Sequence, residues 1–298
     1  MALLQLWPIL LFFAAGYALK HTGRVPENLP HQLNMVAIRL VFPALILATV
    51  PFLDTSASAG LPVLAAYGCA AVAILAVVLL ARLTGIDRET RCALLILTAL
   101  GNTGFLGVPM LKTLAGVEPL TYAILFDQFG TFILLSSYAL LVVSLQSGEK
   151  LHPGKMLIDI LSFPPLLALV AAMLLPAQWL APVQQPLLLI SKLVIPLTML
   201  SIGMKFRFLL PRHHIGPLVA ALVIKMLLLP LVVLAAAQTL GVDADIQLAS
   251  VFQAATPPMV TGAALLMSRN IASDLTAAIL GFGTLLSFIW LPLVLLVA

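Results

Sequence analysis

The sequence predicts an all-α integral membrane protein: ten transmembrane helices form two inverted five-helix repeats, and helices 4 and 9 are broken and cross near the membrane midplane. Three observations lead to this fold. The 298 residues are 62% hydrophobic and only 9% charged, which is too little charge to cover a soluble domain. Apolar runs of about 20 residues, long enough to cross a bilayer as helices, recur along the whole chain. Short motifs also recur at one constant distance in the two halves.

Polar breaks separate the ten expected spans, and no stretch between them is long enough for a soluble domain. The first span lacks the basic residues that precede the apolar part of a signal peptide, so we interpret it as a membrane span. The two cysteines, Cys69 and Cys92, lie in or beside apolar runs and do not indicate a disulfide framework. In chain order the expected spans cover residues 3–19, 31–53, 61–83, 92–115, 119–146, 157–180, 184–204, 215–240, 246–268 and 274–297.

Most of the positive charge falls in alternate connections between these spans, on one side, whereas Lys112 falls on the other side. Positive residues mark the cytoplasmic side, so we expect both termini to face outward from a plasma membrane, the inner membrane of a bacterium. This topology accounts for the net charge of +4 without a nucleic-acid partner, and the expected surroundings are the lipid bilayer. The residues on the cytoplasmic side are Lys20, Arg24, Arg82, Arg88, Arg91, Lys150, Lys155, Lys205, Arg207, Arg212 and Arg269.

Three pairs of matching positions, each 153 residues apart, relate the two halves of the chain. They predict a first repeat at 1–148 and a second at 149–298. Because each repeat has an odd number of spans, the second is inverted in the membrane, a layout typical of secondary transporters. The matches are RLVFP at 39–43 with KLVIP at 192–196, FGT at 129–131 with FGT at 282–284, and Thr103 with Thr256.

Two expected spans contain residues that interrupt a helix at corresponding places. GNTGFLGVP at 101–109 interrupts the fourth span, and Thr256-Pro257-Pro258 interrupts the ninth. Proline removes an N–H and clashes with the preceding turn, and backbone groups freed inside a membrane must line a cavity or be buried in protein. We expect the prolines to begin restarting half-helices, whose positive N-terminal ends meet and hold an anion. The carbonyl ends of the first half-helices would suit a cation.

The substrate-binding residues are expected at this crossing. The Asn102 amide and two threonine hydroxyls supplement the helix ends, and Gln253 forms a wall one turn before the second break. Glycines at spacing three, at 101, 104 and 107, have the alternative role of a small face for close helix contact. The repeat relation between the breaks favours a binding site. Its expected residues are Asn102, Thr103, Gly104, Gly107, Pro109, Gln253, Thr256, Pro257 and Pro258.

Charged residues within the spans are expected to serve coupling or gating. Each costs at least about 2.5 kcal/mol at the bilayer centre, so it should face a partner or water. Asp127, beside Gln128, is the only acid well within a span, and we expect it to couple transport to H+ or Na+, or to be the counter-ion of Lys192 or Lys225. Arg39 corresponds to Lys192 in the repeat and indicates a paired structural or gating role. We expect no cofactor and no metal site.

These motifs resemble the auxin efflux carrier family, within the bile/arsenite/riboflavin transporter superfamily. The resemblance rests on GNTGFLGVP, Asp127-Gln128, the RLVFP and KLVIP segments and the proline break of the ninth span, and it covers essentially the whole chain. The family includes plant auxin exporters and bacterial proteins often labelled malonate transporters. The resemblance implies alternating scaffold and transport domains, with a small organic anion bound beside the crossing. It implies that Asn102 and Thr103 line the first crossing segment and that Thr256, Pro257 and Pro258 line the second.

Two departures from the plant members favour a bacterial-type carboxylate carrier over an indole-acid carrier. Only residues 147–156 join the fifth and sixth spans, and Ala255-Thr256 stands where an asparagine would be expected at the second crossing segment. The expected function is therefore a secondary active transporter that moves a small organic anion, a carboxylate, by alternating access. The sequence is also compatible with a homodimer.

Other function classes fit the sequence less well. An aspartyl protease needs two buried acids and only one is expected, the HExxH-type site of a metallopeptidase is absent, and no histidine lies within a span to pair with a serine, so we expect no enzyme activity. No nucleotide-binding GxxxxGK[ST] loop is present, so we do not expect ATP to drive transport within this chain. An anion channel is a weaker alternative, because broken helices also line pores. A sodium-coupled bile-acid-type symporter is the closer alternative, although it would be expected to carry more polar and acidic cation ligands at the crossing.

Overall fold

A computed structural model describes residues 7–23, 25–52, 60–147, 152–205 and 214–298. Within these ranges every regular element is a helix, and one isolated β-bridge joins Gly101 and Pro258. Several sequence expectations fall outside the described residues. They concern residues 3–6 and 53 of the first two spans, the repeat boundary at 148–149, and the charged residues Arg24, Lys150, Arg207 and Arg212, together with the side chain of Lys155.

The first half of the chain forms helices that are repeatedly interrupted by short π-helical or 3-10 turns, labelled η. Their bounds are α2 (Trp7–His21), α3 (Leu29–Val36), η1 (Ala37–Val41), α4 (Phe42–Thr49), η2 (Val50–Phe52), α5 (Leu61–Thr84), α6 (Arg88–Ala99), η3 (Thr103–Gly107), α7 (Val108–Ala115), α8 (Leu120–Leu125), η4 (Phe126–Thr131), α9 (Phe132–Leu134), η5 (Leu135–Ala139) and α10 (Leu140–Ser147).

The second half has the same character, with longer uninterrupted helices near the C-terminus. Its elements are α11 (Pro153–Leu161), α12 (Pro164–Leu174), α13 (Ala177–Ser191), α14 (Val194–Lys205), α15 (Ile215–Val223), η7 (Ile224–Leu228), α16 (Leu229–Leu240), α17 (Ala244–Ala254), α18 (Val260–Met267) and α19 (Ser273–Val294).

Six helical runs in the described part of the chain are long and apolar enough to cross a membrane. The other expected spans are shorter or divided: α2 has 15 described residues, α11 is separated from α12 at 162–163, and the fourth and ninth spans are interrupted between α6 and η3 and between α17 and α18. The six runs are Leu29–Phe52, Leu61–Thr84, Leu120–Ser147, Ala177–Lys205, Ile215–Leu240 and Ser273–Val294.

The expected division between spans six and seven was wrong. The sequence places it near Pro182, but α12 already ends at Leu174, and the next helix begins at Ala177. Pro182 and Pro186 lie inside α13, and both are exposed. Membrane helices tolerate such internal prolines. The extended backbone of Leu175 and Pro176 makes the actual break.

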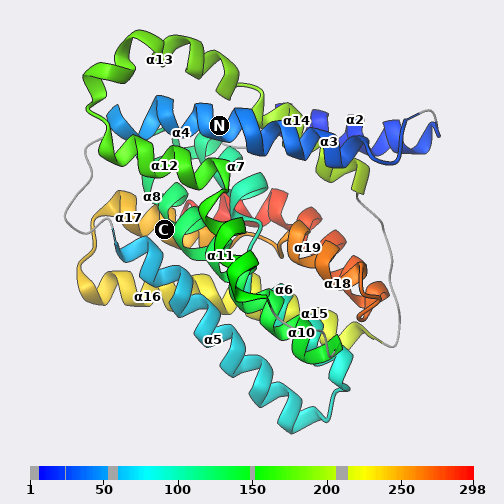
Figure 1. The fold of residues 1–298 in the computed structure, drawn as a ribbon. Coiled ribbons are helices and arrows are strands. Elements are labelled where there is room, and N and C mark those ends of the chain that lie inside the picture. Colours follow the sequence, from blue (N-terminus) through cyan, green and yellow to red (C-terminus); the bar gives the residue numbers. More distant parts are fainter. Residues whose placement is uncertain (1–6, 24, 53–59, 148–151, 206–213) are drawn as a thin grey trace.

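The helices form two groups, which Figure 1 shows one above the other. The upper group, called here the panel group, consists of α2, α3, η1, α4, η2, α12, α13 and α14, and the remaining helices are called the crossing group. In the panel group α2 packs on α14, and both α12 and α13 pack on α4. In the crossing group α5 packs on α6 and η4, α16 packs on α17, and α18 packs on α19. Each group therefore contains helices from both halves of the chain.

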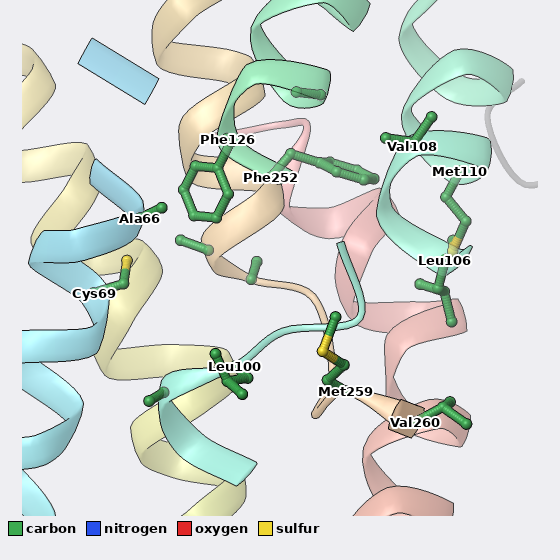
Figure 2. Close-up of a cluster of buried hydrophobic side chains, with 14 of the residues drawn as sticks. Ala66, Cys69, Leu100, Leu106, Val108, Met110, Phe126, Phe252, Met259 and Val260 are labelled. Atoms are coloured by element: carbon green, nitrogen blue, oxygen red, sulfur yellow. The ribbon is translucent and has the colours of Figure 1, made fainter. Parts of the chain in front are cut away.

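Large apolar side chains are abundant on the outside of the molecule, including Trp7, Leu83, Leu174 and Leu240, each more than 60% exposed. A soluble protein rarely leaves so many exposed, whereas lipid tails surround such residues favourably. Part of the apolar core lies around the segments that link α6 to η3 and α17 to α18, where Leu100, Phe252 and Met259 are buried (Figure 2). The fold thus places polar backbone breaks inside its buried core.

A left-handed glycine and a capping aspartate form the turn that leads from α5 into α6. Gly85 ends α5 with φ +65°, and the Asp87 carboxylate accepts a hydrogen bond of 2.9 Å from the Thr90 N–H in the first turn of α6. The Thr90 side chain, and to a smaller extent this backbone hydrogen bond, lower the pKa of Asp87. The cap therefore stabilises the fold above about pH 4, and this contribution is lost as the pH falls through the lowered pKa.

Replacing this cap should weaken the protein measurably. We expect Asp87→Ala to cost about 1 kcal/mol of unfolding free energy, because a first-turn N–H loses its acceptor. The check is the melting temperature in detergent. Asp243, before α17, makes no side-chain cap hydrogen bond, so Asp243→Ala is the matched control and should melt close to the wild type. Equal destabilisation by both variants would contradict the assignment of the cap.

Candidate functional site

Two helix breaks lie side by side at the centre of the crossing group. The first half-helix α6 ends at Ala99, the backbone of Leu100 is extended, and the helix resumes as η3 at Thr103. In the other half of the chain α17 ends at Ala254, and α18 begins at Val260. Both helices thus stop and restart within one buried region.

The two breaks are joined by backbone hydrogen bonds. The Asn102 N–H donates to the Pro257 carbonyl oxygen at 2.7 Å, and the Met259 N–H donates to the Leu100 carbonyl oxygen at 3.0 Å. Between these bonds Gly101 and Pro258 form an antiparallel bridge. Figure 2 shows the two extended segments, with Leu100 and Met259 beside them, surrounded by buried apolar side chains. Each break therefore supplies partners for backbone groups that lipid could not satisfy.

The prolines do not begin the second half-helices in the expected way. Pro257 and Pro258 lie in the extended segment before α18, and the helix containing Pro109 has already started at Thr103 with a π-helical turn. The physical reason lies in the pairing between the breaks. Neither hydrogen bond between the breaks needs an N–H from Pro257 or Pro258, because the donors are Met259, in the same segment, and Asn102, in the opposite one. Proline, which has no N–H, therefore suits these two positions.

Glycines in the first break allow the two segments to approach closely. A Cβ atom at Gly107 would collide with Gln253 Oε1 and lie 2.9 Å from Thr256 Cγ2. A Cβ atom at Gly101 would collide with the Thr256 hydroxyl. Gly101 and Gly107 therefore allow the close helix contact that was considered as their alternative role. Gly104 differs, because a Cβ atom there would face the Asp127 carboxylate at 3.1 Å.

Asp127 is buried, and its carboxylate has hydrogen-bond partners from two elements. Thr103 Oγ1 donates to Oδ1 at 2.5 Å, and Gln128 Nε2 donates to Oδ2 at 2.5 Å. Of the two lysines considered as its counter-ion, Lys192 is exposed, and Lys225 donates to the Ala254 carbonyl oxygen at 2.5 Å. The described residues therefore do not pair Asp127 with either lysine. Its contact with Thr103 joins η4 to the first residue of η3.

Three of the four charged residues expected to serve coupling or gating lie in π-helical turns. Arg39 lies in η1, Asp127 in η4 and Lys225 in η7. Such turns are rare in α-helices and occur frequently at functional sites. Asp127 and Lys225 are buried, whereas Arg39 is exposed. The two buried charges approach the crossing from different sides, one against Thr103 and the other against Ala254.

Several buried polar side-chain atoms near the crossing have no hydrogen-bond partner in the protein. Both polar atoms of the fully buried Asn102 side chain are among them, as are Gln128 Oε1 and Gln253 Oε1. The other end of Gln253 donates to the Ala123 carbonyl oxygen at 3.0 Å. Buried polar groups are normally hydrogen-bonded, so these atoms are polar groups that a ligand at the crossing could use.

A small cavity of about 120 Å³ borders the crossing between the two helix groups. Gly104 and Phe105 lie near the start of η3–α7, and Met259 and Thr261 lie at the start of α18, so both restarting half-helices border this one cavity. Free N–H groups and the positive end of the dipole lie at a helix start. The cavity is lined by Ile38, Phe42, Gly104, Phe105, Asp127, Gln128, Phe132, Leu135, Phe163, Pro165, Met259 and Thr261.

The expected substrate-binding residues divide into two sets. Gly104 lines the small cavity, together with the coupling candidates Asp127 and Gln128. The other eight are buried in or beside the contact between the two breaks and do not line this cavity: Asn102, Thr103, Gly107, Pro109, Gln253, Thr256, Pro257 and Pro258. The sequence missed the aromatic wall of the cavity. Phe132 stacks on Phe163 with ring centroids 3.6 Å apart, and Phe42 meets Phe105 edge-on at 5.8 Å. No sequence signal separates these rings from lipid-facing ones.

A larger cavity of about 750 Å³ lies between α2, α3 and α14 on one side and α18 and α19 on the other. Lys20, His31, Lys205 and Glu27 line its panel-group side, and Thr284 and Ser268 line the opposite side. Val260 lines this cavity, whereas its neighbours Met259 and Thr261 line the small one. The first turn of α18 therefore contributes to both cavities.

Comparison with known proteins agrees with these features. The sequence profile of the membrane transport protein family matches residues 1–295. The chain is 28% identical over 290 residues to an uncharacterized transporter of Methanothermobacter thermautotrophicus, covering 96% of this chain and 94% of that protein. It is 31% identical over 173 residues to an uncharacterized transporter of Methanocaldococcus jannaschii, covering 56% of this chain and 54% of that protein. The chain therefore belongs to the membrane transport protein family, the auxin efflux carrier family that its motifs resemble, and is a multi-pass membrane transporter.

Proposed function

We propose that this transporter is a secondary active carrier of a small organic anion, a carboxylate, which binds beside the crossing of the two broken helices. One observation carries the proposal: two helix N-termini border the same small cavity, next to the buried and unpartnered Asn102 amide. Helix N-termini attract anions through their free N–H groups and the helix dipole. The amide adds two donors for carboxylate oxygens.

The size and wall of the cavity favour a small carboxylate over a bile acid. Sites for drug-sized ligands have volumes of about 300–1,000 Å³, whereas this cavity has about 120 Å³. Its four phenylalanine rings form an apolar wall that suits the carbon skeleton of the anion. We therefore favour the small-carboxylate carrier over the sodium-coupled bile-acid-type symporter.

We propose that the chain consists of two five-span repeats of opposite orientation. The contacts support this layout, because the first span (α2) packs on the seventh (α14), and the sixth (α12) packs on the second (α4). Likewise, α5 packs on α6 as α16 packs on α17. The turns between these pairs also match: Gly85 and Gly241 both end a helix in the left-handed conformation, with φ +65° and +61°.

In the proposed cycle the crossing group moves against the panel group. The small cavity lies between the two groups, and Asn102 is closed off from it in this conformation, so binding requires the groups to shift. The larger cavity would be the access route from the cytoplasm, since the excess of lysine and histidine on its panel side attracts anions. Both termini then face outward, as the distribution of positive residues indicates.

Asp127 is the proposed proton-coupling group. It lines the same cavity as the two helix N-termini. Two adjacent carboxylates repel each other when both are ionised, so a bound carboxylate favours the protonated form of Asp127. Transport of the anion would then be linked to transport of a proton.

The test is a melting-temperature screen of the purified protein in detergent with monocarboxylates, dicarboxylates and indole acids. A ligand at a hundredfold excess over its Kd stabilises the folded state by about 2.7 kcal/mol, so a true substrate should raise the melting temperature clearly. We expect Asn102→Ala to weaken binding at least about tenfold, equivalent to about 1.4 kcal/mol. Asn34→Ala, the same change in α3, is the control and should bind normally. No stabilisation by any carboxylate, or equal stabilisation of Asn102→Ala, would overturn the proposal.

A further inference from the structure

Lys225 is a buried lysine whose ammonium group lies at the end of a half-helix of the crossing. Its side chain is only 2% exposed and extends from η7, in a different helix from either broken one. Its Nζ donates a hydrogen bond of 2.5 Å to the carbonyl oxygen of Ala254. Ala254 is the last residue of α17, immediately before the second break. The charge is therefore aimed at the carbonyl end of this half-helix.

Each of the last four carbonyl oxygens of α17 accepts a hydrogen bond from another group of the protein. The Ala255 N–H bonds to the Val251 and Phe252 carbonyl oxygens at 3.0 and 3.2 Å. The Gln253 carbonyl oxygen accepts from the Thr256 hydroxyl at 2.7 Å, and only Ala254 is left for the ammonium. The last carbonyls of a helix otherwise have no intrahelical partner and carry the negative end of the dipole. The Lys225 ammonium thus donates the hydrogen bond that the Ala254 carbonyl oxygen at this helix end accepts.

The first break leaves space for the ammonium group. A Cβ atom at Gly101 would lie 3.0 Å from Lys225 Nζ and 3.1 Å from Lys225 Cε. Lys225 therefore touches both broken helices, the end of α17 and the extended segment after α6. A neutral side chain would have sufficed to fill this space. Burying a charge costs free energy unless an opposite charge or dipole compensates it, and here the ammonium lies at the negative end of a helix dipole.

In secondary transporters with broken helices, carbonyl ends of half-helices coordinate the coupling cation. We propose that the Lys225 ammonium is a built-in cation at the crossing, which occupies the carbonyl site where a sodium-coupled carrier would bind its ion. Transport then requires no sodium, and the fixed charge moves with the crossing group. The inference rests on the proposed transport function, but its test needs no substrate.

The test compares melting temperatures in NaCl, KCl and choline chloride at equal ionic strength, without substrate. We expect the wild type to show no sodium-specific shift. Lys225→Ala removes the ammonium and exposes the Ala254 carbonyl, so it should melt lower in choline chloride and gain at least about 2 °C in NaCl. Lys225→Gln, which keeps most of the side-chain volume without the charge, should respond to sodium in the same direction. Lys112→Ala is the control, because Lys112 donates to the side-chain hydroxyl of Ser191 and not to a backbone carbonyl at the breaks, and it should not respond.

Two results would overturn the inference. Sodium-specific stabilisation of the wild type would show that an external cation still binds, and this result does not depend on any variant folding. Absence of a sodium response in both Lys225 variants would show that the carbonyl end is not a cation site. In liposomes, wild-type exchange of a labelled carboxylate should be unchanged when choline replaces sodium. If no carboxylate is exchanged under any condition, the proposed function fails while the cation measurements stand.

Discussion

Asp127→Asn is expected to abolish accumulation of the carboxylate driven by a pH gradient while leaving exchange intact. The amide is isosteric with the carboxyl group and keeps an oxygen that can accept from Thr103, whose hydroxyl lies 2.5 Å from Asp127 Oδ1. It cannot take up or release a proton. A gradient of one pH unit is worth about 1.4 kcal/mol per proton, or about tenfold accumulation, and the variant should lose this factor completely.

The measurement uses proteoliposomes with a labelled carboxylate, once under a pH gradient and once under exchange without a gradient. Retained exchange shows that the variant is folded and still binds its substrate. Asp274→Asn makes the same chemical change at an exposed position in the first turn of α19, and it should accumulate substrate like the wild type. If Asp127→Asn keeps full pH-driven accumulation, or if the wild type shows none, Asp127 is not the coupling group.

Gly203→Leu is expected to prevent α2 from docking on α14, the most extensive helix contact within the described residues. A Cβ atom at Gly203 would collide with the Phe13 carbonyl oxygen and lie 3.0 Å from the Tyr17 nitrogen. Gly16, on the other helix, faces the Leu200 carbonyl oxygen in the same way. Small residues let membrane helices approach with their backbones in contact. Because these obstacles are backbone atoms, the cost should exceed the usual overpacking penalty of about 1–3 kcal/mol.

The readout is the fraction of monodisperse protein after detergent extraction, together with its melting temperature. Gly68→Leu is the matched control, since Gly68 also lies within a long helix but has open space around it. That variant should be neutral or slightly stabilising, because glycine is a poor helix former by about 1 kcal/mol. Similar losses in both variants would mean that glycine removal itself, and not the contact between α2 and α14, causes the effect.

Local rules in the sequence account for the features that depend on neighbouring residues. A 62% hydrophobic chain with few charges must have lipid around it, and the described part contains six helices suited to crossing a membrane. The Gly-Asn-Thr-Gly run and the adjacent prolines at 257–258 disfavour a continuous helix through their own backbone chemistry, and α6 and α17 end just before them. The family motifs likewise consist of short contiguous stretches. A local rule alone did not decide the conformation at Pro182, which lies inside α13 although proline also suits a helix break.

Only the tertiary structure decided which distant groups meet. Asn102 bonds to Pro257, Asp127 to Thr103, and Lys225 to Ala254, and no local pattern shows which of the buried charges pairs with which partner. The sequence suggested a lysine as a partner for Asp127, since opposite charges attract in a medium of low dielectric constant. The packed helices instead hold the acid against a hydroxyl and the lysine against a helix end. Contacts between residues far apart in the chain depend on how whole helices pack, and packing depends on all their side chains together. The sequence alone therefore determined the class of protein and the positions of the two breaks near Asn102 and Pro257, whereas the arrangement of charges around the crossing was decided by the fold.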